Sequence, residues 1–254
     1  MTTPLLEARS LVKHYGSVEA LRGASFQVAA GEVVSLIGDN GAGKSTFIKC
    51  LSGAEQPDSG EILFDGKQIH LDSPNAARAL GIETVYQDLA VAPDLDPAAN
   101  LYLGREIKRG GILGALGMLD KKEMRRKASE EFARLGVTLQ SVDVPIASLS
   151  GGQRQSVAVA RSVVWASKVV FMDEPTAALG VVQRERVLDV IRKVRDQGIG
   201  VVLISHNMPE VLSVSDRVEV LRLGKRVARF KAEDATLEDL VGAMTGALVQ
   251  EDAA

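Results

Sequence analysis

The sequence has little cysteine and little excess charge of either sign. Its 254 residues include a single cysteine, Cys50, which excludes an intrachain disulfide framework and a metal site built from several cysteines. The 30 basic and 33 acidic residues leave a net charge of −3, so the chain lacks the overall positive charge of a nucleic-acid-binding protein. Because Cys50 stands in an apolar stretch, we expect a buried core residue rather than a catalytic thiol.

A long apolar run is also missing. No stretch approaches the ~20 apolar residues that a membrane-spanning helix needs. The longest candidate, residues 110–119, contains four glycines; we expect a loop or a partly buried surface segment there. The N-terminus lacks the basic and then apolar layout of a signal peptide. We therefore predict a soluble, intracellular protein whose contact with a membrane depends on a partner.

The composition is that of an ordinary globular protein, with 46% hydrophobic and 25% charged residues, which excludes disorder as the main state. Short runs rich in β-branched residues predict strands that are buried on both faces, as in a parallel sheet covered by helices. They are residues 33–37, 82–86, 169–172 and 201–204. Helical patterns lie between them, at residues 45–51, 121–135, 153–165, 181–197 and 209–213. This alternation predicts an α/β core.

Other segments predict antiparallel strands outside this core. They are residues 5–15, 24–28, 61–69 and 216–230, of which the last two read as hairpins that turn at Asp65-Gly66 and at Gly224. A short helix is expected at residues 237–244. Residues 88–165 carry helical patterns and no convincing buried strand, so we predict a helical subdomain inserted into the α/β core.

A glycine-rich segment, residues 38–45 (Gly-Asp-Asn-Gly-Ala-Gly-Lys-Ser), fits the P-loop pattern between a predicted strand and a predicted helix. Glycines let consecutive backbone N–H groups surround phosphate oxygens, and the helix adds the positive end of its dipole. Lys44 is placed to reach the β- and γ-phosphates, Ser45 to bind Mg²⁺, and Thr46 to hold the α-phosphate. The predicted phosphate-binding residues are Gly38, Asn40, Gly41, Gly43, Lys44, Ser45 and Thr46.

Two carboxylates follow the predicted strand at residues 169–172, at the end of a parallel sheet where ligands bind. Asp173 is placed to hold Mg²⁺, directly or through water, and Glu174 to orient or deprotonate an attacking water. Such a pair can instead cap the following helix, but its occurrence with a P-loop favours catalysis. The two motifs together predict a P-loop nucleotide hydrolase.

A second glycine-rich helix start, Leu149-Ser150-Gly151-Gly152-Gln153, makes the prediction more specific. Here the sequence resembles the ATP-binding subunit of ATP-binding-cassette (ABC) transporters, whose signature is this pentapeptide. The resemblance covers residues 5 to about 244. It implies that ATP binds between the P-loop of one copy and Ser150, Gly151, Gly152 and Gln153 of a second, head-to-tail copy. The alternative is an ordinary helix that Ser150 caps.

Further residues match the family's pattern. Tyr15 looks like the aromatic residue that stacks on adenine, Gln87 like the glutamine that touches Mg²⁺ or the attacking water, and His206 like the histidine that contacts the γ-phosphate. A strand tyrosine or a lone histidine can also be structural, as we expect for His14 and His70. The resemblance implies Lys44, Gln87, Glu174 and His206 as catalytic residues and Ser45, Gln87 and Asp173 as Mg²⁺ ligands.

The resemblance also implies a domain organisation. A single ABC ATPase domain is expected over residues 5–246, with an α/β P-loop NTPase core that has a mostly parallel sheet and an antiparallel β subdomain. Its expected parts are a core at 5–87 and 166–230, a helical subdomain at about 88–165, and a short C-terminal helix and tail at 231–254.

One position departs from the family. The loop after the acidic pair usually ends in Leu-Asp, whereas this chain has Leu179-Gly180, so the acidic residue that helps two subunits signal to each other is missing. The Ala-Ala-Leu-Gly form resembles single-domain carbohydrate importers of the ribose, xylose and fructose type. We therefore expect retained activity and leave open how tightly the two ATP sites are coupled.

The expected function is that of an ATP-hydrolysing subunit that energises a carbohydrate importer, with ATP and Mg²⁺ as cofactors. Its expected partners are a second copy, transmembrane permease subunits and, indirectly, a solute-binding protein, with no nucleic acid. It would lie on the cytoplasmic face of the inner membrane, with the permease contact near Gln87 and residues 94–103. The basic run at 121–127 is either a lipid-facing cluster or, as we favour, a solvated helix face.

Three alternatives remain at this point. The nearest is an importer of another small solute, such as an amino acid. A soluble ABC-type protein of DNA repair, chromosome structure or translation is disfavoured, because the chain has one P-loop, one cysteine and no sustained heptads. A regulatory module without catalysis is disfavoured by the presence of Lys44, Asp173, Glu174 and His206.

Overall fold

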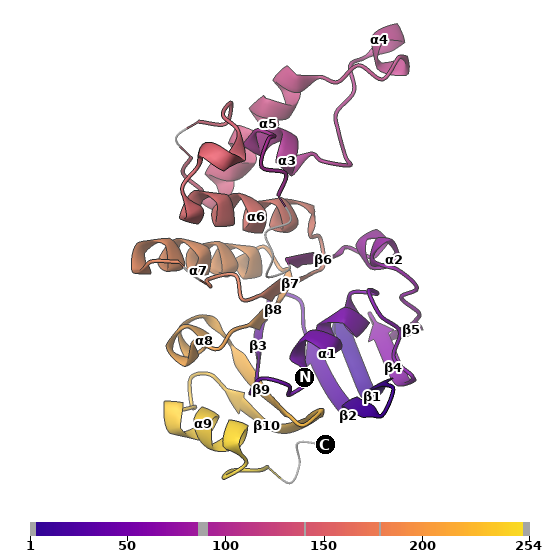
Figure 1. Cartoon of the computed structure of the whole chain (residues 1–254), viewed down its shortest axis with the longest axis vertical. Helices are drawn as coiled ribbons and strands as arrows, with labels where there is room; N and C mark the ends of the chain where they lie inside the picture. The colour runs from indigo at the N-terminus through magenta and orange to yellow at the C-terminus, as the bar shows by residue number, and fades with distance from the viewer. Residues whose placement is uncertain (1–3, 86–90, 140, 178, 251–254) are drawn as a thin grey trace.

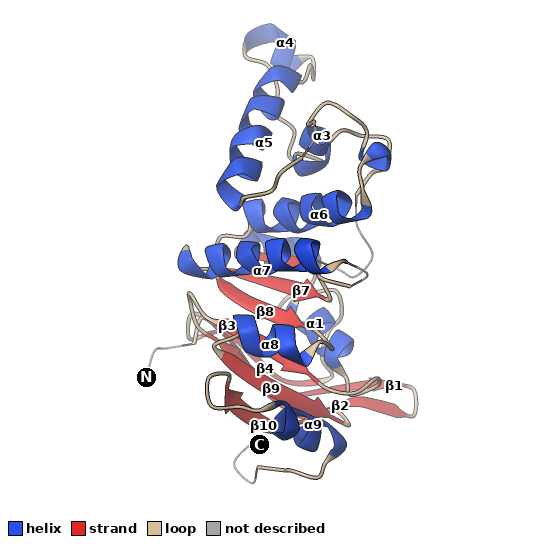
Figure 2. Ribbon diagram, turned by 90° about the vertical axis from the view of Figure 1, so that its left-hand side faces the viewer, coloured by secondary structure: helices blue, strands red, loops and turns tan. Residues whose placement is uncertain are grey.

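The computed structural model describes residues 4–85, 91–139, 141–177 and 179–250. Its centre is a six-stranded sheet with the strand order β10-β9-β3-β8-β7-β6 (Figures 1 and 2). The strands are β3 (Val33–Ile37), β6 (Ile82–Val85), β7 (Val169–Asp173), β8 (Gly200–Ile204), β9 (Arg217–Arg222) and β10 (Lys225–Lys231). All neighbours are parallel except β9 and β10, which form the predicted hairpin at one edge. The predicted parallel sheet is confirmed.

A second, antiparallel sheet stands beside the first, with the order β2-β1-β4-β5 (Figure 1). It contains β1 (Leu6–Tyr15), β2 (Val18–Val28), β4 (Ser59–Phe64) and β5 (Lys67–Ile69). The predicted turn between β4 and β5 is confirmed, since Asp65 and Gly66 have φ of 51° and 74°, as a tight hairpin turn requires. Helix α1 (Lys44–Leu51) packs on this sheet, where Phe47 meets Phe26 edge to face at 5.8 Å.

The helical part occupies one end of the long axis (Figure 1). The short helix α2 (Pro74–Ala79) precedes the helical part in the chain. The helical part itself contains α3 (Pro97–Leu101), α4 (Gly111–Ala115), α5 (Lys121–Leu135), a 3₁₀ turn at Ile146–Ser148, and α6 (Gly151–Trp165). Between residues 91 and 165, the described residues form no strand, only one isolated bridge. The absence of a buried strand is thus confirmed for the described part. Phe132 of α5, Val157 of α6 and Val170 of β7 share one hydrophobic core, so this part is not a separate body.

Residues 110–119, predicted as a loop or a partly buried surface segment, lie at the surface and contain the short helix α4, in which no residue is buried. The two ends of this segment are joined by backbone hydrogen bonds, from Arg109 N to Met118 O at 2.9 Å and from Asp120 N to Ile107 O at 2.7 Å. Within this closed loop, Leu116 N donates to Ile112 O at 3.0 Å and so forms one helical turn. The four glycines therefore did not prevent a helix of one turn.

The remaining helices cover the central sheet. They are α7 (Val181–Asp196), α8 (Met208–Val214) and α9 (Leu237–Thr245), of which α9 lies at the opposite end from α4 (Figures 1 and 2). No helix of the described residues is both long enough and apolar enough to span a bilayer. Cys50 is fully buried, and burial raises the pKa of its thiol to about 11, which confirms the predicted core role.

Candidate active site

A cleft of about 860 Å³ gathers the predicted phosphate-binding and acidic residues from separate parts of the chain. It lies at the carboxyl ends of β3, β7 and β8, which meet at one edge because these strands are parallel. Its predicted lining residues are Tyr15, Gly38, Asn40, Gly41, Gly43, Lys44, Ser45, Thr46, Asp173, Glu174 and His206. Gln87 lies outside the described residues.

The glycine-rich loop has a shape that leads directly into α1. Gly43 precedes the helix with φ of 102°, a left-handed conformation, and a Cβ atom there would lie 2.6 Å from the carbonyl oxygen of Ala20. Glycine is therefore required at this position. No side chain caps the start of α1, whose backbone N–H groups open on the cleft. Such a helix start favours an anion such as phosphate.

Lys44 is held in the loop by its own backbone. Its ammonium group donates to the carbonyl oxygens of Gly38 at 2.7 Å and Asp39 at 2.9 Å. Burial lowers the pKa of Lys44, while the charges of Glu174, Asp173 and Asp39 oppose that shift. The cation is thus partly desolvated, and it lies in the loop that lines the cleft.

The acidic pair is placed by the end of β7. Burial raises the pKa of Asp173; the charge of Glu174 adds to this shift and Lys44 opposes it. Glu174 has φ of 49°, an uncommon conformation for a residue other than glycine, and its N–H donates to Ile204 O at 2.9 Å. Strain of this kind typically costs about 1–3 kcal/mol and is found where function requires a particular side-chain direction.

His206 and Glu174 lie next to each other at the mouth of the cleft. The Nδ1 atom of His206 is 3.0 Å from Oε1 of Glu174. The imidazole is 73% exposed and the carboxylate 23% exposed. This contact brings together the ends of β7 and β8. A carboxylate oriented by an imidazole is suited to accept a proton from water.

Tyr15 forms a side wall of the cleft. Its hydroxyl donates to Glu55, and burial followed by this hydrogen bond raises the pKa of the phenol. The ammonium of Lys13 lies 5.9 Å from the ring centroid. With 43% of the residue exposed, the ring is accessible to a flat ligand such as a nucleobase.

The second glycine-rich helix start lies elsewhere. Ser150 caps α6 in a capping box with Gln153, with distances of 3.3 Å and 3.2 Å for the two reciprocal bonds. Among the described residues that line the cleft at Lys44, none comes from 150–153; Ser150, Gly152 and Gln153 line a separate cavity against α7. Within one chain, the two glycine-rich helix starts therefore do not form a common pocket.

A buried carboxylate that was not predicted from the sequence, Glu210 of α8, lies behind the site. Its oxygens accept from the Thr176 hydroxyl at 2.6 Å, from the Asn207 amide at 2.8 Å and from the Arg184 guanidinium at 3.3 Å. Thr176 lies in the loop after Glu174, and Asn207 follows His206. The Asn-x-x-Glu spacing signals a helix start, but it does not identify the partners from other segments.

A Glu210→Ala variant should lower the free energy of unfolding by about 2 kcal/mol, because it leaves the buried Thr176 hydroxyl and the partly buried Arg184 without their acceptor. Urea unfolding followed by circular dichroism measures this loss. Glu185→Ala, at an exposed position of α7, is the matched control and should leave the midpoint unchanged. Equal midpoints for both variants would contradict a structural role of Glu210.

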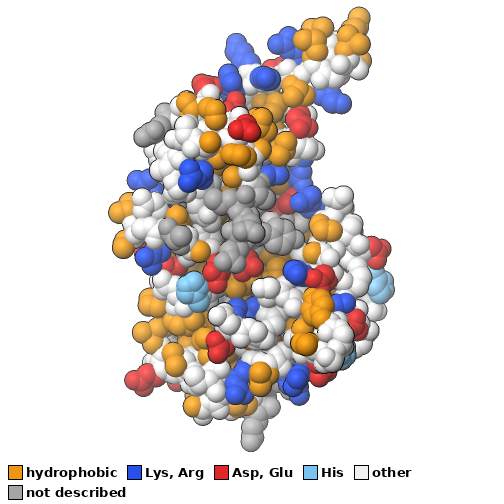
Figure 3. Space-filling model, viewed as in Figure 1, with side chains coloured by type: hydrophobic (Ala, Val, Ile, Leu, Met, Phe, Trp, Pro, Cys, Tyr) orange, Lys and Arg blue, Asp and Glu red, His pale blue; other side chains and the backbone are white. Residues whose placement is uncertain are grey.

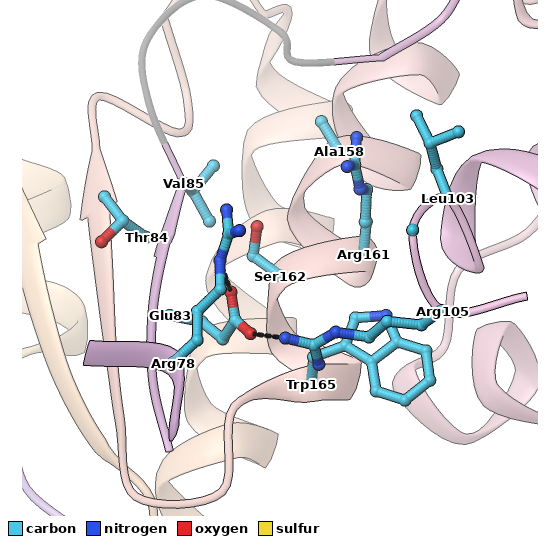
Figure 4. Close-up of a pocket in the computed structure, with 11 residues that line it drawn as sticks. Arg78, Glu83, Thr84, Val85, Leu103, Arg105, Ala158, Arg161, Ser162 and Trp165 are labelled. Carbon is cyan, nitrogen blue, oxygen red and sulfur yellow. Dashed lines mark hydrogen bonds and ion pairs between the residues drawn. The ribbon is translucent and has the colours of Figure 1, made fainter. Parts of the chain in front are cut away.

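A second groove lies between β6, α2 and α6 (Figure 4). Glu83 accepts from Arg105 at 2.6 Å and pairs with Arg78 at 3.5 Å, and the Arg105 guanidinium stacks over the Trp165 ring at 4.7 Å. Arg161 lines the same groove; burial lowers its pKa, and so do the charges of Arg78 and Arg105. Three arginines around one glutamate give the groove a positive charge.

Comparisons with known proteins agree with the chemistry of the cleft. Residues 21–177 match a family described as ABC transporter. The chain is 52% identical over 246 residues to the fructose import ATP-binding protein FrcA of Rhizobium meliloti, covering 96% of this chain and 95% of that protein. It is 44% identical to the xylose/arabinose import ATP-binding protein XylG of Sulfolobus acidocaldarius, covering 95% and 94%.

A longer relative matches over part of its length. The chain is 42% identical to a ribose import ATP-binding protein of Rubrobacter xylanophilus, covering 98% of this chain and 48% of that protein. Among solved structures, the ADP conformation of an ATP-binding cassette of an ABC transporter superposes with a TM-score of 0.81 and 28% identity, covering 94% of this chain and 96% of that one. A nucleotide-free cassette superposes with a TM-score of 0.77 and 27% identity, covering 90% and 92%.

Proposed function

Because this chain belongs to the ABC transporter family, we propose that it is the ATP-hydrolysing subunit that energises a carbohydrate importer. The observation that carries the ATPase assignment is the meeting of Lys44, Glu174 and His206 in one cleft at the ends of parallel strands. Carbohydrate import is supported by the relatives described above, which are named as fructose, xylose/arabinose and ribose import proteins. These names do not favour the amino-acid alternative.

We propose the following roles in the cleft. The ring of Tyr15 stacks on adenine, while Lys44, Thr46 and the N–H groups of the glycine-rich loop hold the phosphates. Glu174 takes a proton from the attacking water, and His206, 3.0 Å from it, contacts the γ-phosphate. Gln87, which lies outside the described residues, stays a predicted ligand of Mg²⁺ or of the water.

The residues of the cleft fit a Mg²⁺ ion. Ser45 and Asp173 offer hard oxygen donors, and Mg²⁺ is commonly held by one or two carboxylates together with substrate phosphates. Burial raises the pKa of Asp173 and the adjacent charge of Glu174 raises it further, so a cation here relieves repulsion between the two carboxylates. When bound, the ion neutralises charge that develops on the phosphate oxygens during transfer.

We propose that a second copy completes each ATP site. The start of α6, with Ser150, Gly151 and Gly152, lies outside the cleft of its own chain and is available to the phosphates held by another. ATP then favours the closed pair, and loss of the γ-phosphate favours its opening, because the two states differ in affinity for the nucleotide.

Gly180 bears on the contact between the copies. It precedes α7 with φ of −72° and ψ of 165°, a conformation open to any residue, so the backbone does not require glycine there. We propose that the missing acidic side chain loosens the coupling of the two ATP sites without abolishing hydrolysis. We also propose the domain boundaries predicted from the sequence, with one domain at residues 5–246 and the helical subdomain at about residues 88–165.

We propose that the groove around Glu83 docks a permease subunit and so places the chain on the cytoplasmic face of the membrane. The groove is lined by β6 of the central sheet and by α6 of the helical part (Figure 4). A permease segment bound there would therefore move when the sheet and the helical part shift relative to each other. Leu103 of the groove belongs to the segment predicted to contact the permease. A solute-binding protein would contact the permease on the other side.

An affinity-tagged chain, purified from its native membrane in mild detergent, is expected to retain its permease and the solute-binding protein, on which a bound sugar can be identified. An Arg105→Glu variant should lose the permease, since it removes the stacking on Trp165 and places a second carboxylate beside Glu83. ATP binding by the purified variant shows that it is folded. Full retention of the permease by this variant, or a bound amino acid instead of a sugar, would contradict the corresponding part of the proposal.

A further inference from the structure

The far end of the helical part carries an exposed apolar surface that the ATPase reaction does not use. We call residues 107–119 the tip loop. Four of its large apolar side chains are exposed, Ile112 at 81%, Leu116 at 74%, and Leu113 and Met118 at 45% each. Figure 3 shows hydrophobic atoms at this upper end, bordered by basic side chains. A cluster of this kind on a soluble surface marks a site of contact with a partner or a membrane.

The tip loop has a defined backbone. Its two ends are tied by the bond from Arg109 N to Met118 O, the bond from Asp120 N to Ile107 O and the antiparallel bridge between Lys108 and Leu119. Within it, Leu116 N donates to Ile112 O at 3.0 Å and so closes the turn of α4. The apolar side chains are therefore held outward on a projecting, convex element.

The charged side chains within the tip loop are all basic. The loop contains Lys108 and Arg109 and no acidic residue, and Lys121 and Lys122 follow at its base. These four side chains are exposed and form no ion pair with the residues that the structure describes. The rest of the basic run is different, because Arg125, Arg126 and Lys127 pair with Asp96, Asp143, Glu123 and Glu130, as expected of a solvated helix face.

Two acidic residues flank the tip loop, Glu106 and Asp120, and each accepts a hydrogen bond from a backbone N–H group. The Glu106 carboxylate accepts the N–H of Gly104 at 3.0 Å, and this bond, with the charge of Lys108 as a smaller cause, lowers its pKa. Asp120 caps α5 by accepting the N–H of Glu123 at 3.0 Å. Both carboxylates keep their negative charge, so residues 106–122 hold four basic and two acidic side chains, an excess of two positive charges that favours anions.

The tip loop and the proposed permease groove face the same side of the molecule. Figure 1 shows α4 extending to the side on which α2 lies, and α2 contributes Arg78 to the groove. We propose that the tip loop inserts its apolar side chains into the surface of an anionic bilayer, while Lys108, Arg109, Lys121 and Lys122 contact lipid headgroups. This inference rests on the proposed function, since the docked permease turns that side toward the membrane.

The experiment is flotation of the purified full chain with vesicles of phosphatidylglycerol and phosphatidylcholine, compared with vesicles of phosphatidylcholine alone. The chain should bind the anionic vesicles, and added salt should weaken that binding. An Ile112→Ser/Leu116→Ser variant should bind at least about tenfold more weakly, and so should a Lys108→Gln/Arg109→Gln variant. Val241→Ser, at a 51% exposed apolar position of α9, is the matched control and should bind like the original chain.

Three results would overturn the proposal. They are the absence of binding to anionic vesicles, equal binding of the tip-loop variants and the original chain, and self-association that depends on Ile112 and Leu116 in place of vesicle binding. ATP hydrolysis, measured in the same samples, separates this proposal from the proposed function. Normal hydrolysis without vesicle binding rejects the lipid contact alone, whereas absence of hydrolysis in the original chain rejects the ATPase.

Discussion

A Lys44→Ala variant is expected to bind ATP at least about 100-fold more weakly than the original chain, and to show no measurable hydrolysis. The side chain lies in the loop at the start of α1, partly desolvated, with its ammonium on the carbonyl oxygens of Gly38 and Asp39. Phosphate oxygens carry more negative charge than these carbonyls, so they compete for the cation when ATP binds. Alanine leaves that charge without its nearest counter-charge in a site that excludes much of the solvent.

Equilibrium dialysis with ATP measures this effect, and a phosphate-release assay follows the hydrolysis. Lys225→Ala removes an exposed lysine from β10 and is the matched control, which should bind ATP with unchanged affinity. Circular dichroism verifies that both variants are folded. Unchanged ATP affinity of Lys44→Ala would reject the phosphate cradle.

A Glu174→Gln variant is expected to bind ATP normally but to hydrolyse it about 10²–10⁴-fold more slowly. The amide keeps the size of the side chain and its hydrogen bond with His206, which is 3.0 Å away, but it cannot accept a proton from water. Because ATP then persists between the two glycine-rich helix starts, the variant should accumulate as a pair of chains. Burial remains the main cause of the raised pKa of Asp173, but removal of the negative charge takes away the smaller contribution of Glu174.

Phosphate release measures the turnover of this variant, and size-exclusion chromatography with light scattering, in the presence of ATP and Mg²⁺, measures its mass. Glu185→Gln, on the exposed side of α7, is the control. It should hydrolyse ATP at the original rate, and its measured mass should match that of the original chain under the same conditions. Full turnover in Glu174→Gln would remove Glu174 from the catalytic role. A variant that stays monomeric while it holds ATP would reject the shared site.

Features carried by consecutive residues were predictable from the sequence. The β-branched runs gave the parallel strands because such residues suit a surface buried on both faces. The glycine-rich loop and the acidic pair followed from short spacings, since one loop wraps a phosphate and one strand end presents Asp173 and Glu174. Even the turn at Asp65-Gly66 is a local property of two residues. Local features were also missed: the short helices α2 and α3 and the first part of β2 were not predicted, and one helical turn forms at residues 110–119 between ends that backbone bonds tie together.

Contacts between distant segments were decided only by the tertiary structure. The sequence by itself determined that two glycine-rich helix starts exist, but the strand order β3-β8-β7 brings Lys44, Glu174 and His206 into one cleft and leaves Ser150 outside it. In the same way, two of the three partners of Glu210, Thr176 and Arg184, come from the distant segment that follows β7. A residue's type and spacing fix what it can bond to nearby, whereas which distant residue it meets depends on how whole strands and helices pack around a shared core.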